Sequence, residues 1–404
     1  MEGTNAPDES STLAELEDME LVEDSGYSSG DASSRLHPER LDFDHINTLE
    51  TFTEDLNQAL SGSFPRPSYP YSSVNCLFLS WADDDLNVQL EILQLQEVFE
   101  RQFRFTTKEF KIPSKPNPTR ALQDELYAFQ NAHQDENELL IVYYAGHGEA
   151  DYRRGRSIWC ANLHKDSPSL NWSSLQHLLE TAIPHVLIIL DCCFAANAAR
   201  DTTEGTTKEL LAACGRENPT LGVGERSFTS ALIEELKAFQ SNPFTVAMLH
   251  SRLICMRWRL KYTPILAMLS EKSTPSIHLA PIPVEGTSPP TGLELGASID
   301  TRVLLAVSVA QNTEFIVTDW TNWLNTHQAP AEILKIDVRI ESAYKSHSTL
   351  ILLSVPTLAW SRMVDRDAYN FIGFVRSENL LRKSEVQDLD ATKQEKLTGS
   401  KLAR

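Results

Sequence analysis

The sequence predicts an α/β protein with a mainly parallel sheet covered by helices on both faces, followed by a small α+β domain. Three observations support this prediction. Over residues 73–283, short apolar runs alternate with segments whose apolar residues recur at helical spacing, which is the pattern of parallel strands joined by crossover helices. The pattern breaks at a segment rich in Pro and Gly, residues 284–298. Beyond it, residues 334–341 alternate strictly between apolar and charged, as a half-buried strand does.

The strands and helices of the first region follow from their apolar spacing. Uninterrupted apolar runs predict buried strands, and weaker apolar or aromatic runs predict further ones. Apolar residues three and four apart predict helices, one beginning at Asn117 with Pro118 in its first turn and another capped by Ser227. The predicted strands are 74–80, 104–112, 139–145, 157–162, 186–190, 209–214 and 276–282, and the predicted helices are 85–103, 117–130, 173–182, 227–239 and 245–258.

The second region has the order strand, helix, strand, strand, helix, strand, which suggests a ferredoxin-like sandwich. Its predicted strands are 302–309, 333–341, 348–355 and 369–377, and its predicted helices are 313–327 and 356–364. The segments around the two regions are richer in polar residues, Pro and Gly. The sequence therefore divides into a disordered acidic tail at 1–45, a short helix and Pro/Ser linker at 46–72, an α/β domain at 73–283, a linker at 284–298, an α+β domain at 299–377 and a charged tail at 378–404.

Charge and composition narrow the classes of function. The chain carries 36 basic and 56 acidic residues, a net charge of −20, which argues against nucleic acid or an anionic membrane as a partner and favours basic peptides. Neither a signal peptide nor an apolar run of membrane-spanning length is evident. Six cysteines in 404 residues do not form a disulfide framework, so we expect a reducing, cytoplasmic setting.

Two apolar strands end on reactive side chains. The first, "LIVYYAGHG", places His147 between Gly146 and Gly148, and the second, "HVLIILDCC", runs into Cys192 and Cys193. The two strands have one predicted buried helix between them, so we expect them to be neighbours in the sheet. Ligands of open parallel sheets bind at the carboxyl ends of the strands. His147 and Cys193 are therefore expected to meet at that edge, although they lie far apart in the sequence.

A cysteine beside a histidine is suited to nucleophilic catalysis. The imidazole takes the thiol proton, the thiolate attacks a carbonyl carbon, and the imidazolium protonates the leaving amine. The N–H groups of Gly148 and Cys193 are the expected donors to the oxyanion of the tetrahedral intermediate. Each residue alone is more often a buried thiol or a structural histidine, but the pair at matching strand ends favours catalysis. Zinc binding is disfavoured because the adjacent Cys192 and Cys193 would point to opposite sides.

These two motifs resemble those of the caspase/metacaspase clan, specifically of fungal-type caspase-like proteins. "YYAGHG" resembles the family's Tyr-x-Gly-His-Gly strand end, and "LDCC" resembles its Asp-x-Cys, in which the cysteine is the nucleophile. The order of elements over residues 73–283 also matches. The resemblance implies a caspase-like fold and a cysteine endopeptidase with His147 and Cys193 as its catalytic dyad. The paired aspartates that metacaspases use for calcium are not evident, and Asn171 and Ser173 stand there instead, so we predict neither a cofactor nor a metal.

The resemblance also suggests a substrate class. Metacaspases accept Arg or Lys before the scissile bond through acidic residues, one of which is the Asp of Asp-x-Cys, here Asp191. The loop "WADDDL" adds Asp83, Asp84 and Asp85 at the same rim, and grouped carboxylates favour a guanidinium or ammonium group. The three loop aspartates are nearly as well explained as caps of the following helix. Asp191 also has a structural interpretation, in which it holds the nucleophile loop in place by hydrogen bonds.

We therefore predict hydrolysis of protein or peptide substrates after basic residues, with no role for nucleic acid or membrane. The alternative is a caspase-like regulatory module with little protease activity that binds a protein partner through the C-terminal domain. A nucleotide-binding switch is disfavoured because the chain has no Gly-x-x-x-x-Gly-Lys-Ser/Thr loop. Self-cleavage is expected in the connection that follows the nucleophile strand, at Arg200 or Lys208, because related enzymes are processed there.

Overall fold

The architecture is that of a computed structural model, which describes most of the chain from residue 45 to residue 380. The residues left undescribed are 1–44, 66–69, 152, 165, 196–204, 215–223, 225, 240–241, 257–258, 261, 271–274, 284–300, 311–337, 346–347, 365, 378 and 381–404. The predicted acidic tail and charged tail, the linker at 284–298 and the predicted helix at 313–327 therefore lie wholly or almost wholly outside the described residues.

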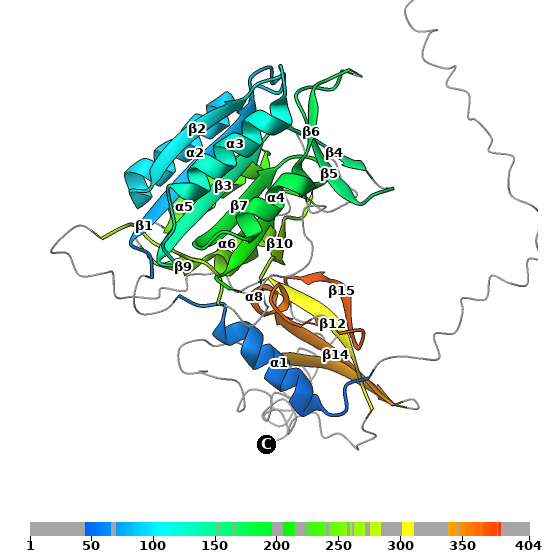
Figure 1. Ribbon diagram of the computed structural model, residues 1–404. Helices are drawn as coiled ribbons and strands as arrows, with labels where there is room; N and C mark the ends of the chain where they lie inside the picture. The colour runs from blue at the N-terminus through cyan, green and yellow to red at the C-terminus, as the bar shows by residue number, and fades with distance from the viewer. Residues whose placement is uncertain are drawn as a thin grey trace, which may run out of the picture. The chain divides into compact units, whose positions relative to one another are not determined.

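A six-stranded sheet of order β10-β8-β7-β3-β1-β2 forms the centre of the first region. Figure 1 labels its strands β1, β2, β3, β7 and β10. Its strands are β1 (Ser73–Trp81), β2 (Thr106–Ile112), β3 (Glu138–Ala145), β7 (His185–Asp191), β8 (Lys208–Ala212) and β10 (Ile265–Met268). All neighbouring pairs are parallel except β8 and β10, which are antiparallel. The predicted, mainly parallel sheet is therefore confirmed.

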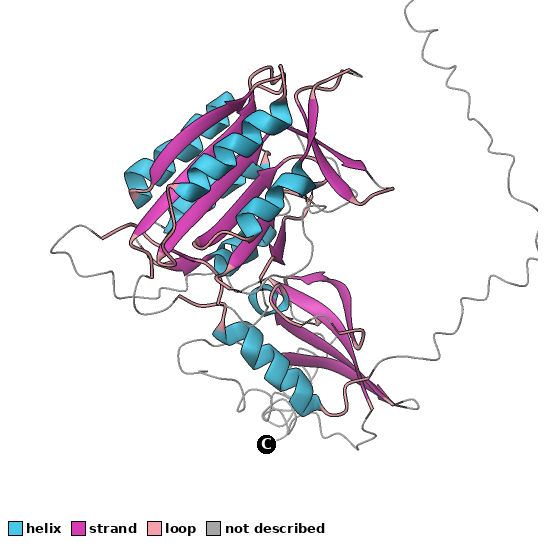
Figure 2. Cartoon of the chain, viewed as in Figure 1, coloured by secondary structure: helices cyan, strands magenta, loops and turns pink. Residues whose placement is uncertain are grey.

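Helices cover both faces of this sheet (Figure 2) because its central strands are apolar on both sides. In β3, Ile141 and Tyr143 belong to one core, and Val142 and Tyr144 belong to the other. The first core is completed by α2 (Gln89–Glu97), α5 (Phe228–Phe239) and α6 (Val246–Cys255), and the second by α3 (Pro118–Asn131) and α4 (Trp172–Glu180). After α2 the chain continues as a π-helical turn, η2 (Val98–Phe103), within the segment predicted as one helix.

The predicted helix starts are explained by their capping residues. Asn117 Oδ1 accepts the N–H of Arg120 at 3.0 Å, with Pro118 as the first residue of α3. Ser227 Oγ accepts the N–H of Ser230 at 3.0 Å at the beginning of α5. Both side chains satisfy N–H groups that the first turn of a helix leaves without a partner.

The end of the main sheet differs from the prediction. The run 276–282 was predicted as a last strand, but only β11 (His278–Leu279) forms there, paired with β9 (Phe244–Thr245) in a separate two-stranded sheet. The last strand of the main sheet is instead β10, which pairs with β8 from Ile265 to Met268. A run of four residues beside Pro264 is too short for periodicity to identify as a strand.

A three-stranded antiparallel sheet extends from the carboxyl end of β3. It consists of β4 (His147–Asp151), β5 (Arg156–Cys160) and β6 (Ser169–Asn171). Its core is a stack of three rings, with Tyr144 and Trp159 at 3.6 Å between ring centroids and Trp159 and Trp172 at 4.0 Å. The Tyr144 hydroxyl accepts from Trp81 Nε1 at 3.2 Å and donates to the His147 carbonyl oxygen at 2.8 Å. This buried network fixes the main chain where β4 begins.

The C-terminal region contains a four-stranded sheet of its own, of order β13-β14-β12-β15 with all neighbouring pairs antiparallel. Its elements are β12 (Arg302–Val309), β13 (Arg339–Lys345), β14 (Thr349–Pro356), α8 (Thr357–Trp360) and β15 (Tyr369–Val375). The small α+β domain is therefore confirmed. It also includes α1 (Leu49–Ser61), because Phe52 and Leu56 of that helix share a core with Leu305 and Leu353. None of the described helices has the length and apolar composition needed to cross a bilayer.

Candidate active site

The two strands that carry the predicted dyad are adjacent. β3 and β7 are parallel neighbours, with Ala145 opposite Asp191 in the register. The Gly146 N–H donates to the Asp191 carbonyl oxygen at 3.3 Å, so the contact continues past the end of β3. The predicted adjacency of the two strands is confirmed, and both reactive residues follow carboxyl ends at the same edge of the sheet.

The backbone at Gly148 lies directly against the turn that carries the cysteines. A Cβ atom at Gly148 would lie 2.4 Å from the Cys193 carbonyl oxygen and 3.2 Å from Cys192 Sγ. Only glycine leaves room for this approach. This main-chain contact joins β4 to the turn after β7. Cys193 takes part in it, and His147 is the residue directly before Gly148.

The two adjacent cysteines have different surroundings. Cys192 is fully buried in the core on the α3 and α4 face of the sheet, and burial raises the pKa of its thiol well above the ordinary value. Cys193 is partly exposed. The next residue, Phe194, has φ 56° in the left-handed region, where a bulky side chain is strained. Beneath this turn, Cys214 Sγ donates to the Cys192 carbonyl oxygen at 3.4 Å.

The ring of His147 is buried and held by a carboxylate. His147 is 5% exposed, and its Nε2 lies 2.6 Å from Asp85 Oδ1. Sequence reasoning grouped Asp85 with Asp83 and Asp84, but the structure separates the three. Asp83 is exposed, Asp84 Oδ2 accepts the N–H of Val88 at 3.2 Å before α2, and Asp85 reaches the histidine.

Asp191 lies beside a second acidic residue that the sequence analysis did not select. Its Oδ2 accepts from the hydroxyl of Thr229 at 2.6 Å and from the Thr229 N–H at 3.3 Å, at the beginning of α5. Burial, with a further contribution from the charge of Glu91, raises the pKa of Asp191 to about 7 against the opposing hydrogen bonds of Thr229. Glu91 is itself 6% exposed and accepts from Ser227 Oγ at 2.7 Å. The only indication of Glu91 in the sequence is its position beside the apolar residues Val88 and Ile92 in the predicted helix.

The two predicted self-cleavage residues differ in placement. Arg200 lies outside the described residues. Lys208 is the first residue of β8 and is 2% exposed, and its Nζ donates to the Pro184 carbonyl oxygen at 2.8 Å. Burial lowers the pKa of Lys208 to about 8. Cleavage after Lys208 would require β8 to leave the sheet, because proteases act on locally unfolded chain.

No group of three or more His, Cys, Asp or Glu side chains is arranged to hold a metal ion among the residues that the structure describes. At the position where calcium-binding aspartates were sought, Asn171 precedes α4 and the Ser173 hydroxyl oxygen accepts the N–H of Ser157 at 2.9 Å. The Ser173 hydrogen bond thus joins β5 to the first turn of α4.

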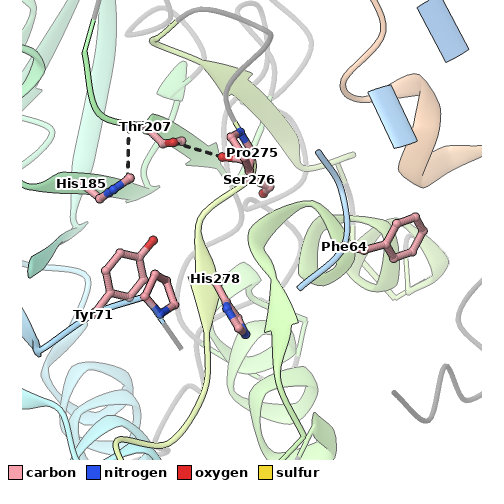
Figure 3. Close-up of a pocket in the computed structure, with 8 residues that line it drawn as sticks. Phe64, Tyr71, His185, Thr207, Pro275, Ser276 and His278 are labelled. Atoms are coloured by element: carbon pink, nitrogen blue, oxygen red, sulfur yellow. Dashed lines mark hydrogen bonds between the residues drawn. The ribbon is translucent and has the colours of Figure 1, made fainter. Parts of the chain in front are cut away.

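A small cavity of about 60 Å³ lies at the opposite end of the parallel strands. It is lined by His185 and Thr207, where β7 and β8 begin, and by Tyr71, which precedes β1. Figure 3 shows the His185 ring accepting the Thr207 N–H (3.2 Å) and the Thr207 hydroxyl donating to the Pro275 carbonyl oxygen (3.1 Å). A space of this volume holds a few water molecules and not a peptide side chain.

Replacement of Gly148 by alanine is expected to reduce any activity of this site by on the order of 10²-fold, because the new methyl group displaces the Cys193 carbonyl and with it the Cys193 side chain. The measurement is kcat/KM together with the thermal unfolding midpoint. Gly373→Ala, at a position where an added Cβ meets nothing within 4 Å, is the matched control and should change neither. Unaltered activity in Gly148→Ala would mean that this contact does not position the cysteine.

Comparison with known proteins identifies the first region. Residues 87–285 match the family model described as "Caspase domain". The solved structures that are similar to the chain include caspase-1 from Spodoptera frugiperda and pro-sf-caspase-1, each at 12% sequence identity and a TM-score of 0.33. Each alignment covers 51% of this chain, and 94% and 97% of the respective solved chains. No curated protein matches the sequence.

The family match spans both His147 and Cys193 and the elements from α2 to β11, which include every strand of the main sheet except β1. Residues 87–285 therefore form a caspase domain, the domain of caspase-family cysteine peptidases.

Proposed function

We propose that this chain is a metacaspase-like cysteine endopeptidase that cleaves after Arg or Lys, with Cys193 as nucleophile and His147 as general base. The observation that carries the dyad is the packing of Gly148 against the Cys193 carbonyl, since it joins the two catalytic loops by a main-chain contact. Cys193 is the more exposed of the two adjacent thiols, and His147 is held rigidly at both its carbonyl and its ring.

The reaction proceeds in two stages. His147 takes the proton of the Cys193 thiol, the thiolate attacks the carbonyl carbon of the scissile bond, and the imidazolium then protonates the leaving amine. The N–H groups of Gly148 and Cys193 stabilise the intermediate oxyanion. Water, deprotonated by His147, hydrolyses the thioester and releases the second product. Each proton that leaves the thiol or the water returns to the amine or to the sulfur.

The preference for a basic side chain rests on the pair Asp191 and Glu91. Two neighbouring carboxyl groups form favourable charge-assisted contacts with a guanidinium or ammonium group that lies between them. The partly protonated Asp191 would be drawn to its charged form by such a ligand. Glu91 is therefore added to the specificity residues, while the capping contact of Asp84 and the histidine contact of Asp85 make these two less suitable.

Fluorogenic peptides that differ only in the residue before the scissile bond test this proposal. We expect kcat/KM for Arg and Lys to exceed that for Gln and for Asp by on the order of 10²-fold or more. Asp191→Asn and Glu91→Gln should each lower the Arg-to-Gln ratio by on the order of 10-fold, because each amide loses one charge-assisted contact with the basic side chain of the substrate. The ratio is insensitive to a general loss of activity.

Asp124→Asn is the control for these variants, since Asp124 is an exposed carboxylate paired with Arg120 on α3, and it should leave the ratio unchanged. A preference for Asp over Arg would contradict the proposed specificity. No hydrolysis of any of the four peptides would favour the alternative, a caspase-like module that binds protein partners through its C-terminal domain.

A further inference from the structure

One contact joins His147 of the dyad to a residue that belongs neither to the dyad nor to the specificity pair. Asp85 belongs to the loop between β1 and α2, and His147 begins β4, 62 residues later. Asp85 Oδ1 nevertheless lies 2.6 Å from His147 Nε2. The histidine side chain is 6% exposed and the aspartate side chain 47% exposed, so the pair lies at the rim with the imidazole on its inner side.

The carboxylate can act on the imidazole in a defined way. Asp85 accepts the proton of Nε2–H, which leaves Nδ1 as the ring nitrogen with a free lone pair. Only that tautomer can take a proton through Nδ1. Once the proton has been taken, the imidazolium lies beside an opposite charge and is stabilised.

The main chain of His147 is fixed separately. Its carbonyl oxygen accepts the Tyr144 hydroxyl at 2.8 Å, and that tyrosine stacks on Trp159 within the core. With the carbonyl held from inside and Nε2 held from the loop, the remaining freedom of the ring is small. Because the Asp85 carboxylate already contacts the His147 ring, it is poorly placed to bind the basic group of a substrate.

We propose that Asp85 is a positioning residue that orients His147 and selects its Nδ1-accepting tautomer, so that the catalytic group of this chain is a Cys–His–Asp triad. The proposal rests on the proposed function, since it assigns Asp85 a role in the same reaction. It replaces the substrate-binding role that the sequence suggested for Asp85.

The rate at which iodoacetamide alkylates Cys193 tests the proposal without a substrate. In Asp85→Asn at neutral pH, we expect alkylation of Cys193 and kcat for the Arg peptide to fall by on the order of 10²-fold, because the amide no longer selects the required tautomer. KM and the Arg-to-Gln ratio should stay within about twofold of wild type. Asp85→Glu should recover part of the loss.

A matched control is available at the far end of the same sheet. Glu138 Oε1 lies 3.2 Å from His133 Nδ1, so Glu138→Gln removes a carboxylate from a histidine away from the site and should alter neither rate. In a His147→Ala background, Asp85→Asn should cause no further loss, because a positioning residue acts only through its histidine.

Two results would overturn the proposal. Unaltered alkylation in Asp85→Asn together with a raised KM for basic peptides alone would make Asp85 a substrate-binding residue. A further loss of alkylation rate on adding Asp85→Asn to His147→Ala would show that it acts independently of the histidine. Failure of wild type to cleave any peptide would count against the proposed function, whereas the alkylation rates would still decide the role of Asp85.

Discussion

Replacement of Cys193 by alanine is expected to abolish peptide hydrolysis, with kcat reduced by on the order of 10⁴-fold or more, because it removes the thiol that we propose forms the thioester. Cys192→Ala is expected to retain activity within about tenfold of wild type. Cys192 is fully buried in the core, and its thiol has a raised pKa that keeps it protonated and unreactive.

The two variants each lose one thiol group, at adjacent positions, so each is a control for the other. Burst and steady-state rates with the best basic peptide, measured on protein of verified fold, provide the comparison. Equal loss in both variants would show that the turn tolerates no substitution and would leave the nucleophile unassigned. Loss in Cys192→Ala alone would place the nucleophile one residue earlier.

The largest effect on stability is expected at the ion pair between Arg362 and Glu209. The Arg362 and Glu209 side chains are 1% and 0% exposed, and Arg362 donates to Glu209 Oε1 at 2.8 Å. Glu209 Oε2 also accepts from the N–H of Ile277 at 3.0 Å. Burial raises the pKa of Glu209 and lowers that of Arg362, so both charges are held against a desolvation cost.

Arg362→Met is therefore expected to lower the free energy of unfolding by about 3–5 kcal/mol, since it leaves a buried carboxylate without its charged partner. Adding Glu209→Gln should restore a substantial part of that loss, because the amide keeps its acceptor oxygen and removes the buried charge. Denaturant unfolding curves measure both values. Glu209 lies on β8, the neighbour of β7, which leads into Cys193, so activity should fall at lower denaturant concentration in the single variant than in the double.

The exposed pair of Arg120 and Asp124, with side chains 69% and 55% exposed, supplies the comparison. Arg120→Met should change the free energy of unfolding by less than about 1 kcal/mol, because solvent screens such a pair. A change of similar size in Arg362→Met would mean that the buried pair does not hold the C-terminal region to β8.

The main sheet could be predicted because its central strands are apolar on both faces and are therefore uninterrupted runs in the sequence. The run at β3 is followed by a glycine-flanked histidine and the run at β7 by a cysteine pair. This is why His147 and Cys193 were predicted to lie close together at one edge of the sheet. β10 was missed because four residues carry too little periodicity. The sequence predicts α1 but does not indicate which sheet covers Phe52 and Leu56, since an apolar stripe does not specify its partner.

The roles of the acidic residues could not be separated from sequence. Asp83, Asp84 and Asp85 are identical and consecutive, and only the three-dimensional path of the loop sends one to solvent, one to a helix start and one to His147. Glu91 was overlooked because a glutamate in an amphipathic helix is ordinarily solvated, whereas here it is buried near Asp191. Lys208 directly precedes the predicted strand 209–214 and was therefore predicted to lie in a loop. In the structure it is the first residue of β8.

Covalent labelling with a peptidyl chloromethyl ketone that ends in Arg tests the central assignment most directly. Mass spectrometry of the inactivated protein is expected to show one adduct per chain, on Cys193, formed in proportion to the loss of activity. The other cysteines, including the buried Cys192 and Cys214, should remain unmodified. Complete inactivation with the adduct on Cys192, or with Cys193 unmodified, would contradict the assignment of Cys193 as the nucleophile.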